Sequence, residues 1–347
     1  MVHRLPEPTP GGRKYAMNEA LQDDFALNQP LSGFAAEAIA TLDPESPTHA
    51  MDVVSVIEAT LDNPMAVLYA EQSHARGEKI AAMKAEGYDY QDRMDAVEDV
   101  EWPQPLAEML EALFEIFAPS HPWVSPDALA PKSVVRDMYE RAMTFGEFCA
   151  FYKVQRSEGL VLRYLTDAYR ALRQTVPEAE RTEELADVIS WLGEVVRSTD
   201  SSLIDEWEAL THPDAPGAAS RPGTTTGEGP RPVRTFTSNT RAFRVAVRNA
   251  MFRRVILAAD DDFEALAALE PTGSAMTSDV WEDALGDYWD EFDEIDDGPD
   301  ARSPAFFVVE ESRRGRLWTV RQIINDPDGD HDWSIAATVD LDECDEA

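Results

Sequence analysis

Apolar residues recur at steps of three and four along most of the first two thirds of the chain. The clearest example begins at Glu158 and ends before Pro177. Its apolar positions are Leu162, Leu165, Tyr169 and Leu172, and its charged positions are Arg163, Asp167, Arg170 and Arg173. This period is typical of an amphipathic helix with one buried face. We therefore predict a long helix here, entered through residues 156–159, with its arginines on the opposite side from its apolar face.

The same period repeats on both sides of this run, with capping residues and prolines between the segments. The predicted helices cover residues 33–42, 51–61, 64–87, 89–100, 105–117, 134–143, 148–153, 180–197 and 200–210. A break at residues 118–123 contains Trp123, which we expect to cover the core. No strand pattern interrupts the series, so residues 32–211 should form an antiparallel helical bundle with short connections.

Two stretches lack this periodicity. Residues 1–31 are rich in proline, glycine and asparagine and are expected to be a leader or a connection. Residues 212–238 combine proline and glycine with serine and threonine, which is typical of a flexible linker. We expect these two stretches to flank the helical bundle.

The last part of the chain, residues 239–347, changes from helical to alternating patterns. A helix is predicted over residues 239–259, followed by acidic helices. Polar and apolar residues then alternate over 305–310, 316–325 and 333–341, with turn sequences between them. The chain is therefore predicted to be mainly α, with an antiparallel helical bundle followed by a small α+β domain that ends in an antiparallel β-meander.

The charge of the chain is extreme and unevenly distributed. The 347 residues carry a formal net charge of -37, which disfavours a protein coated in nucleic acid but leaves room for a local basic groove. Residues 231–254 hold seven arginines and no acid, whereas residues 260–300 hold sixteen acids and no lysine or arginine. Three interpretations stay open: mutual neutralisation of the two segments, a nucleic-acid contact through Arg241, Arg244 and Arg248 on one helix face, or a protein-docking surface.

Catalytic motifs are hard to find. The sequence has no G-x-x-x-x-G-K-[ST] phosphate loop, no D-E-x-[DH] run, and none of the G-x-G-x-x-G, G-x-S-x-G or H-E-x-x-H patterns. The acidic runs at 293–298 and 326–331 lack the glutamate that closes a calcium loop, and we interpret them as a helix end and a hairpin turn that includes His331. We expect no catalytic residue, bound cofactor or metal ion within this chain, and its enzyme class stays unassigned.

The cysteine content and the hydropathy of the chain indicate in which cellular compartment the protein resides. Cys149 and Cys344 are far apart, so neither a disulfide framework nor a cysteine metal site is expected. The N-terminus lacks the apolar segment of a signal peptide, and no apolar run approaches about 18 residues. We expect a cytoplasmic protein that does not contact a membrane.

Several runs of the sequence carry a family resemblance. Glu158-Gly159 with an apolar triplet and Arg163, followed by Leu172-Arg173-Gln174, is similar to the DSHCT helical domain in the C-terminal, non-motor region of DExH-box RNA helicases. Residues 131–145 and 156–165 look closer to the C-terminal domain of a bacterial, actinobacterial-type branch of DEAD/DEAH-box helicases, and residues 42–61 fit the same family. One departure is that Asp167 precedes Arg170, which reverses the order of charges typical of the family.

The resemblance implies a role for the arginines. In such helicases, RecA-like motor domains upstream bind ATP and Mg²⁺, and the C-terminal helices contact the translocating strand. It implies that Arg163, Arg170 and Arg173 contact single-stranded RNA or DNA, because arginine suits bidentate phosphate contacts. The competing interpretation pairs them with Glu158, Asp167 and Glu178. The alternative function is an adaptor whose acidic C-terminal domain docks a basic partner protein, and an enzyme that uses the Asp-rich C-terminal domain is the third.

Overall fold

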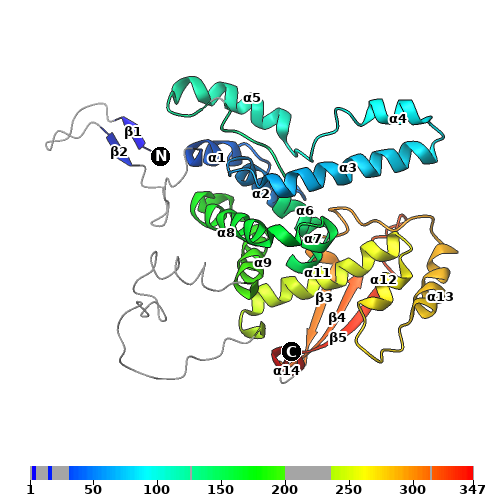
Figure 1. Ribbon diagram of the computed structural model, residues 1–347. Helices are drawn as coiled ribbons and strands as arrows, with labels where there is room; N and C mark the ends of the chain where they lie inside the picture. The colour runs from blue at the N-terminus through cyan, green and yellow to red at the C-terminus, as the bar shows by residue number, and fades with distance from the viewer. Residues whose placement is uncertain are drawn as a thin grey trace. The chain divides into compact units, whose positions relative to one another are not determined.

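The computed structural model describes residues 2–4, 15–17, 31–125, 127–199, 236–312 and 315–346 (Figure 1). The chain divides into two compact units. Unit 1 comprises Met1–Asp137 and Phe145–Thr224, and unit 2 comprises Met138–Thr144 and Thr225–Ala347. The predicted helix over residues 200–210 and almost all of the predicted leader and linker lie outside the described residues.

The chain is mainly α with a small antiparallel sheet, which confirms the predicted fold class. The helices of unit 1 are α1 (Ser32–Ile39), α2 (His49–Ala59), α3 (Met65–Ala85), α4 (Tyr90–Ala96), α5 (Ala107–Phe117), α6 (Val134–Glu140), α7 (Phe145–Phe151), α8 (Glu158–Thr175) and α9 (Glu183–Thr199). The last three residues of α6 belong to unit 2. Two short strands, β1 (Val2–Arg4) and β2 (Tyr15–Met17), pair antiparallel.

The core of unit 1 is built around α2, which is buried along almost its whole length and contacts α1, α8 and α9. Helices α8 and α9 pack closely at Gly193, where an added Cβ atom would lie 2.6 Å from the Tyr169 ring. The buried face of α8 comprises the apolar positions that predicted this helix. They are Leu162, Leu165, Tyr169 and Leu172, and none is more than 8% exposed.

Unit 2 combines helices with a three-stranded meander. Its elements are α11 (Thr240–Ala259), α12 (Phe263–Ala268), α13 (Ser278–Trp289), β3 (Phe307–Glu311), β4 (Leu317–Ile323), β5 (Ser334–Asp340) and α14 (Leu341–Glu346). The strand order is β3-β4-β5, with both pairs antiparallel. Helix α11 packs on the sheet, and the rings of Phe243 and Trp318 lie 5.2 Å apart in the shared core.

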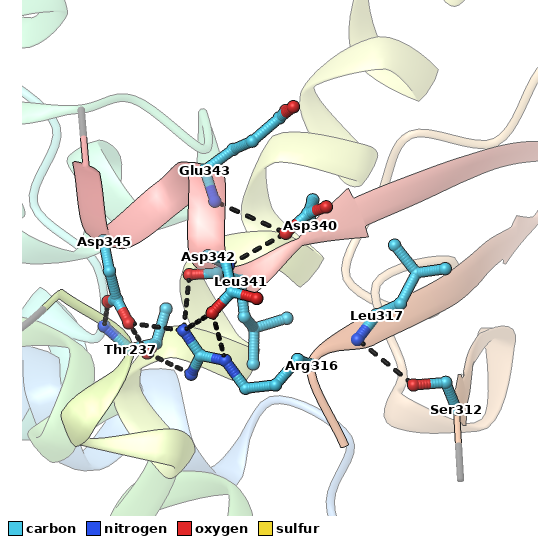
Figure 2. Close-up of polar contacts among 9 residues, drawn as sticks. All are labelled: Thr237, Ser312, Arg316, Leu317, Asp340, Leu341, Asp342, Glu343 and Asp345. Atoms are coloured by element: carbon cyan, nitrogen blue, oxygen red, sulfur yellow. Dashed lines mark hydrogen bonds and ion pairs between the residues drawn. The ribbon is translucent and has the colours of Figure 1, made fainter. Parts of the chain in front are cut away.

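The end of the chain differs from the predicted strand that runs to Leu341. Strand β5 ends at Asp340, because the Asp340 carboxylate accepts hydrogen bonds from the N–H groups of Asp342 and Glu343 and begins α14. Arg316, just before β4, fixes α14 by donating to Asp342 and Asp345 at 2.7 Å each (Figure 2). Asp345 also accepts from the backbone N–H and the hydroxyl of Thr237. The carboxylates of Asp340 and Asp345 therefore hold this end of unit 2 together.

The hairpin turn between β4 and β5 is organised by Asp326. Its carboxylate accepts from the N–H groups of Asp330 and His331, and His331 adopts a positive φ of 57°. Burial opposes ionisation of Asp326, but these backbone donors outweigh burial and lower its pKa. The acidic run at 326–331 is thus a turn, as the sequence predicted. Across the described residues, no helix is both long enough and apolar enough to cross a bilayer.

Candidate nucleic-acid interface

The arginines of α8 do not all face solvent. Arg163 is the outermost of them, with 78% of its side chain exposed, whereas 32% of the Arg170 side chain is exposed. Asp167 lies between them, with a carboxylate oxygen 3.9 Å from Arg163 Nε and another 3.8 Å from Arg170 Nη1. Burial raises the pKa of Asp167, while both arginines act to lower it. The reversed order of Asp167 and Arg170 therefore places an acid where it partly neutralises two of the three predicted contacts.

Arg173 is engaged with the protein itself. Its Nη1 donates to the hydroxyl of Tyr169 at 3.1 Å, and its guanidinium lies 5.8 Å from the centre of that ring. Arg181, near the start of α9, donates to the backbone carbonyl of Arg173. These contacts hold Arg173 against the α8–α9 pair. The helix thus presents Arg163 outward and uses Arg173 largely for packing.

Two further cations precede α8 and were not predicted from the sequence. Lys153 and Arg156 are exposed, and neither side chain has a hydrogen-bond or ion-pair partner among the described residues. Leu160, 58% exposed, lies between Arg156 and Arg163 at helical spacing. We call Lys153, Arg156, Leu160 and Arg163 the α8 basic surface. The sequence does contain a signal for this surface, because residues 150–157 include Lys153 and Arg156 but no acidic residue that could pair with them.

The opposite side of α8 is anchored by a buried carboxylate. The Tyr164 hydroxyl donates to Glu58 Oε1 of α2 at 2.8 Å, and Glu58 is fully buried. This contact fixes the rotation of α8 about its axis, and at this rotation Arg163 faces solvent with 78% of its side chain exposed. The two oxygens of Glu58 also accept from the N–H groups of Val135 and Arg136, at 2.8 and 3.1 Å.

Lys132 completes this buried cluster. Its Nζ donates to the backbone carbonyls of Leu61 and Ala130 at 2.8 and 2.7 Å. Burial raises the pKa of Glu58 from 4.5 to about 7, although its hydrogen bonds and Lys132 act to lower it. Burial also lowers the pKa of Lys132 from 10.5 to about 8, with Glu58 and Asp62 acting in the opposite direction. Both shifts follow from removing charged groups from water. Both side chains are fully buried and hydrogen-bonded to other groups of the protein, so we assign them a structural role.

The same residues lie within the runs that carry the family resemblance. Asp52 and Glu58 of α2 meet Lys132 and Arg136 of the 131–145 run. Arg136 Nη1 lies 3.0 Å from Asp52 Oδ1 and also donates to the Ser55 hydroxyl. A largely buried polar network therefore joins α2, α6 and α8 within these runs.

The three arginines that were predicted to share one face of α11 differ in their exposure to solvent. Arg241 and Arg244 are exposed, but Arg248 is only 5% exposed and does not contribute to a surface. Its Nη2 donates to the Tyr139 hydroxyl at 2.6 Å. Arg302 lies in the same cluster, with its guanidinium 3.9 Å from the centre of the Tyr139 ring. Arg248 was therefore a poor candidate for a strand contact, because an element distant in sequence covers it.

Arg302 is held by three groups around the C-terminal end of α6. Its Nη1 donates to the Glu140 carbonyl at 2.8 Å, and its Nη2 donates to Asn249 Oδ1 at 2.7 Å. Burial lowers the pKa of this guanidinium, and the neighbouring Arg248 does so as well. The Nε atoms of Arg302 and Arg248 and the Nδ2 of Asn249 are buried without a hydrogen-bond partner among the described residues.

An ion pair joins the basic and acidic segments of unit 2. Arg254 donates to Glu270, with Nη2 and Oε1 3.0 Å apart, and both side chains are 15% exposed. The acids on the exposed face of α13 have no such partner among the described residues. Mutual neutralisation of the two segments is therefore local, and it leaves the acidic face of α13 open to solvent.

The described residues contain no group of three or more histidine, cysteine or acidic side chains arranged to hold a metal ion. His331 contacts Asn325 and the ring of Phe306, as a turn residue does. The expectation that Trp123 covers the core is wrong, because its side chain is 70% exposed.

Comparison with known proteins identifies one family. A family model described as a domain of unknown function, DUF3516, matches residues 1–347. No curated protein and no solved structure matches the chain. The match spans every residue of both units, so the chain belongs to the DUF3516 family.

Proposed function

We propose that this chain is the non-motor C-terminal accessory region of an ATP-dependent RNA helicase and that it guides a single strand over the α8 basic surface. The observation behind the proposal is that the exposed side chains of Lys153 and Arg156, which precede the exposed Arg163 along the chain, have no partners among the described residues, in a chain of net charge -37. Exposed cations without internal partners are available for phosphates. ATP and Mg²⁺ belong, in this proposal, to RecA-like motor domains upstream.

The proposed contact is weak and salt-sensitive. Each phosphate contact releases counterions, and the slope of log K against log salt for single strands is about 0.7 per contact. The surrounding negative charge opposes binding, and Asp167 reduces the contribution of Arg163. Leu160 offers an apolar side chain against which a base or sugar can pack. A strand would therefore be held loosely enough to slide.

The test is a fluorescence-anisotropy titration of labelled single-stranded RNA with the whole chain. The variant Arg156→Glu plus Arg163→Glu should bind about tenfold or more weakly at low salt, with a salt slope lowered by roughly 1.4. A matched variant, Lys79→Glu plus Lys84→Glu, makes the same charge change at exposed lysines of α3. An equal loss in both variants would show that net charge alone governs binding and would contradict the proposal.

A second candidate function is an adaptor that docks a basic partner protein through the acidic C-terminal domain. The acidic face of α13 favours it, because Asp279, Glu282, Asp283 and Asp287 are exposed and have no partner among the described residues. In a pull-down with the whole chain as bait, Asp283→Lys plus Asp287→Lys should remove such a partner. The matched change Glu310→Lys plus Glu311→Lys on β3 should leave it bound.

A further inference from the structure

Helix α5 buries one face and leaves an unusual group of side chains on the other. Phe114 and Phe117 pack edge-on against Phe34 of α1, with ring centres 5.4 and 5.5 Å apart. On the outer side, Ile116 is 76% exposed and Trp123, which follows the helix, is 70% exposed. These are the two most exposed large apolar side chains among the described residues. Large apolar side chains left this exposed on one short segment of the chain indicate a candidate interaction site.

Trp123 is held in its outward position by its neighbours. His121 stacks on Phe117 with ring centres 3.6 Å apart and planes 6° apart, and Trp123 meets His121 edge-on at 5.1 Å. The His121 N–H donates to the Ala118 carbonyl, and the N–H of the buried Val124 donates to the His121 carbonyl. A ring fixed in advance loses little conformational entropy on binding, which is a property of aromatic anchors at interfaces.

The charged side chains of α5 are all negative. Glu108, Glu111 and Glu115 are exposed and follow one face of the helix at steps of three and four, and Glu115 directly precedes Ile116. None of the three has a partner among the described residues. The sequence between residues 94 and 131 contains no lysine or arginine. We call Ile116, Trp123 and these three glutamates the α5 patch.

We propose that the α5 patch binds a basic amphipathic segment of a partner protein. Its apolar side chain packs on Ile116 and Trp123, while its lysines or arginines pair with the three glutamates and lie near the Trp123 ring. Complementary charge fixes the register, and cation–π contact favours arginine or lysine beside an indole. A nucleic acid is disfavoured because the patch offers no cation, and a second copy because each chain carries a net charge of -37. This proposal does not depend on the proposed function.

The probe is a fluorescein-labelled peptide of roughly 18 residues with leucines at helical spacing and arginines on its other face. Its two controls are a twin with glutamate in place of arginine and a scrambled peptide without the apolar stripe. At about 0.15 M salt, where distant charges are screened, the basic amphipathic peptide alone should bind. Trp123→Ala should weaken its binding about tenfold, as expected for an anchor. Tyr90→Ala, which removes a ring 68% exposed on α4, should leave the affinity unchanged.

The second part of the experiment tests the glutamates, and it uses variants that change the net charge by the same amount. Glu111→Lys plus Glu115→Lys should weaken binding more than Asp283→Lys plus Asp287→Lys on α13.

Failure of the wild-type chain to bind the peptide would overturn the proposal. Loss of binding in the α13 variant but not in Trp123→Ala would also overturn it and favour the adaptor surface of unit 2. Self-association of the wild-type chain that Trp123→Ala abolishes in sedimentation would assign the patch to a second copy instead. RNA binding should be the same in Trp123→Ala and wild type.

Discussion

The two ends of α6 each meet a buried ionisable side chain, and the two sites differ in sign and in how fully their hydrogen bonds are formed. At the N-terminal end, in unit 1, Glu58 accepts from the first N–H groups of the helix. At the C-terminal end, in unit 2, Arg302 donates to the Glu140 carbonyl. Both signs suit the helix dipole, which favours an anion at the N-terminus and a cation at the C-terminus.

The difference lies in what surrounds each charge. Glu58 receives three donors, and Lys132 provides a nearby opposite charge. Arg302 has Arg248 beside it, neither arginine forms an ion pair with a carboxylate among the described residues, and their Nε atoms lack partners. Removing a well-paired buried group leaves its partners unsatisfied, whereas removing a poorly compensated charge also removes its desolvation cost. Glu58 should therefore be the costlier residue to lose.

The largest expected effect follows from Glu58→Ala. Three buried donors, the N–H groups of Val135 and Arg136 and the Tyr164 hydroxyl, would lose their acceptor. We expect the free energy of unfolding to fall by about 4 kcal/mol at pH 5.5. Urea denaturation followed by circular dichroism measures this, and hydrogen exchange should locate the loss in α2, α6 and α8. Glu37→Ala, at an exposed glutamate of α1, should change stability by less than about 0.5 kcal/mol.

The second prediction uses the pKa of Glu58. In the folded chain it is raised from 4.5 to about 7, so the folded state keeps this proton over a range where the unfolded state has lost it. The stabilisation is complete below pH 4.5 and is lost as pH rises through 7. At 1.36 kcal/mol per unit, the loss amounts to about 3 kcal/mol. Lys132 stays protonated in this window, because its pKa is about 8.

The measurement compares wild type with Glu58→Gln between pH 4.5 and pH 7, where Lys132 stays protonated. The stability of the wild type relative to this variant should decline by about 3 kcal/mol, because glutamine cannot ionise. The difference between the two proteins cancels the titrating groups that do not interact with Glu58. A difference that stays flat across this range would mean that Glu58 ionises at its ordinary pKa and that the buried cluster is more hydrated than its contacts indicate.

Arg302 should give a smaller and pH-independent effect. Arg302→Ala removes the donors to Glu140 and Asn249 together with the packing on Tyr139, and we expect a loss of about 2 kcal/mol. Arg302→Met keeps much of the volume and removes the buried charge, so it should cost about 1 kcal/mol or less. Hydrogen exchange in α11 is the readout, with Arg244→Ala as the exposed control on the same helix. A loss for Arg302→Met that equals that of Glu58→Ala would remove the contrast between the two sites.

The sequence was sufficient to predict most elements but not these two clusters. The helix at Glu158–Thr175 and the three strands follow from apolar periods of 3.6 and 2, which depend on neighbouring residues alone. The burial of Glu58 and Lys132 depends on helices that meet only in the folded chain, and an acidic sequence offers many carboxylates of the same appearance. Arg248 shares a predicted helix face with Arg241 and Arg244, but Tyr139, 109 residues away, decides that it is buried.

The candidate interface was predicted only in part, because the exposure of a side chain also depends on contacts that form in the folded chain. Arg163 was found because it lies opposite the apolar face of a long helix. Lys153 and Arg156 precede that helix, where periodicity gives no guidance about exposure. Trp123 was predicted to cover the core, because large aromatic residues are usually buried. In the structure this ring is exposed and meets the ring of His121 edge-on.

The smallest predicted effects come from removing the tyrosine hydroxyl at each of the two buried sites. Tyr164 donates to the Glu58 carboxylate at 2.8 Å, whereas Tyr139 accepts from Arg248 at 2.6 Å. Each change to phenylalanine should cost about 1 kcal/mol, because one hydrogen bond is lost and the ring stays in place. Only Tyr164→Phe should alter the pH profile, since the hydroxyl favours the ionised form of Glu58 and its loss raises that pKa further. Urea titrations of both variants at several pH values measure this. A pH-dependent effect of Tyr139→Phe would show that a titrating group beside Arg302 and Arg248 compensates their charge.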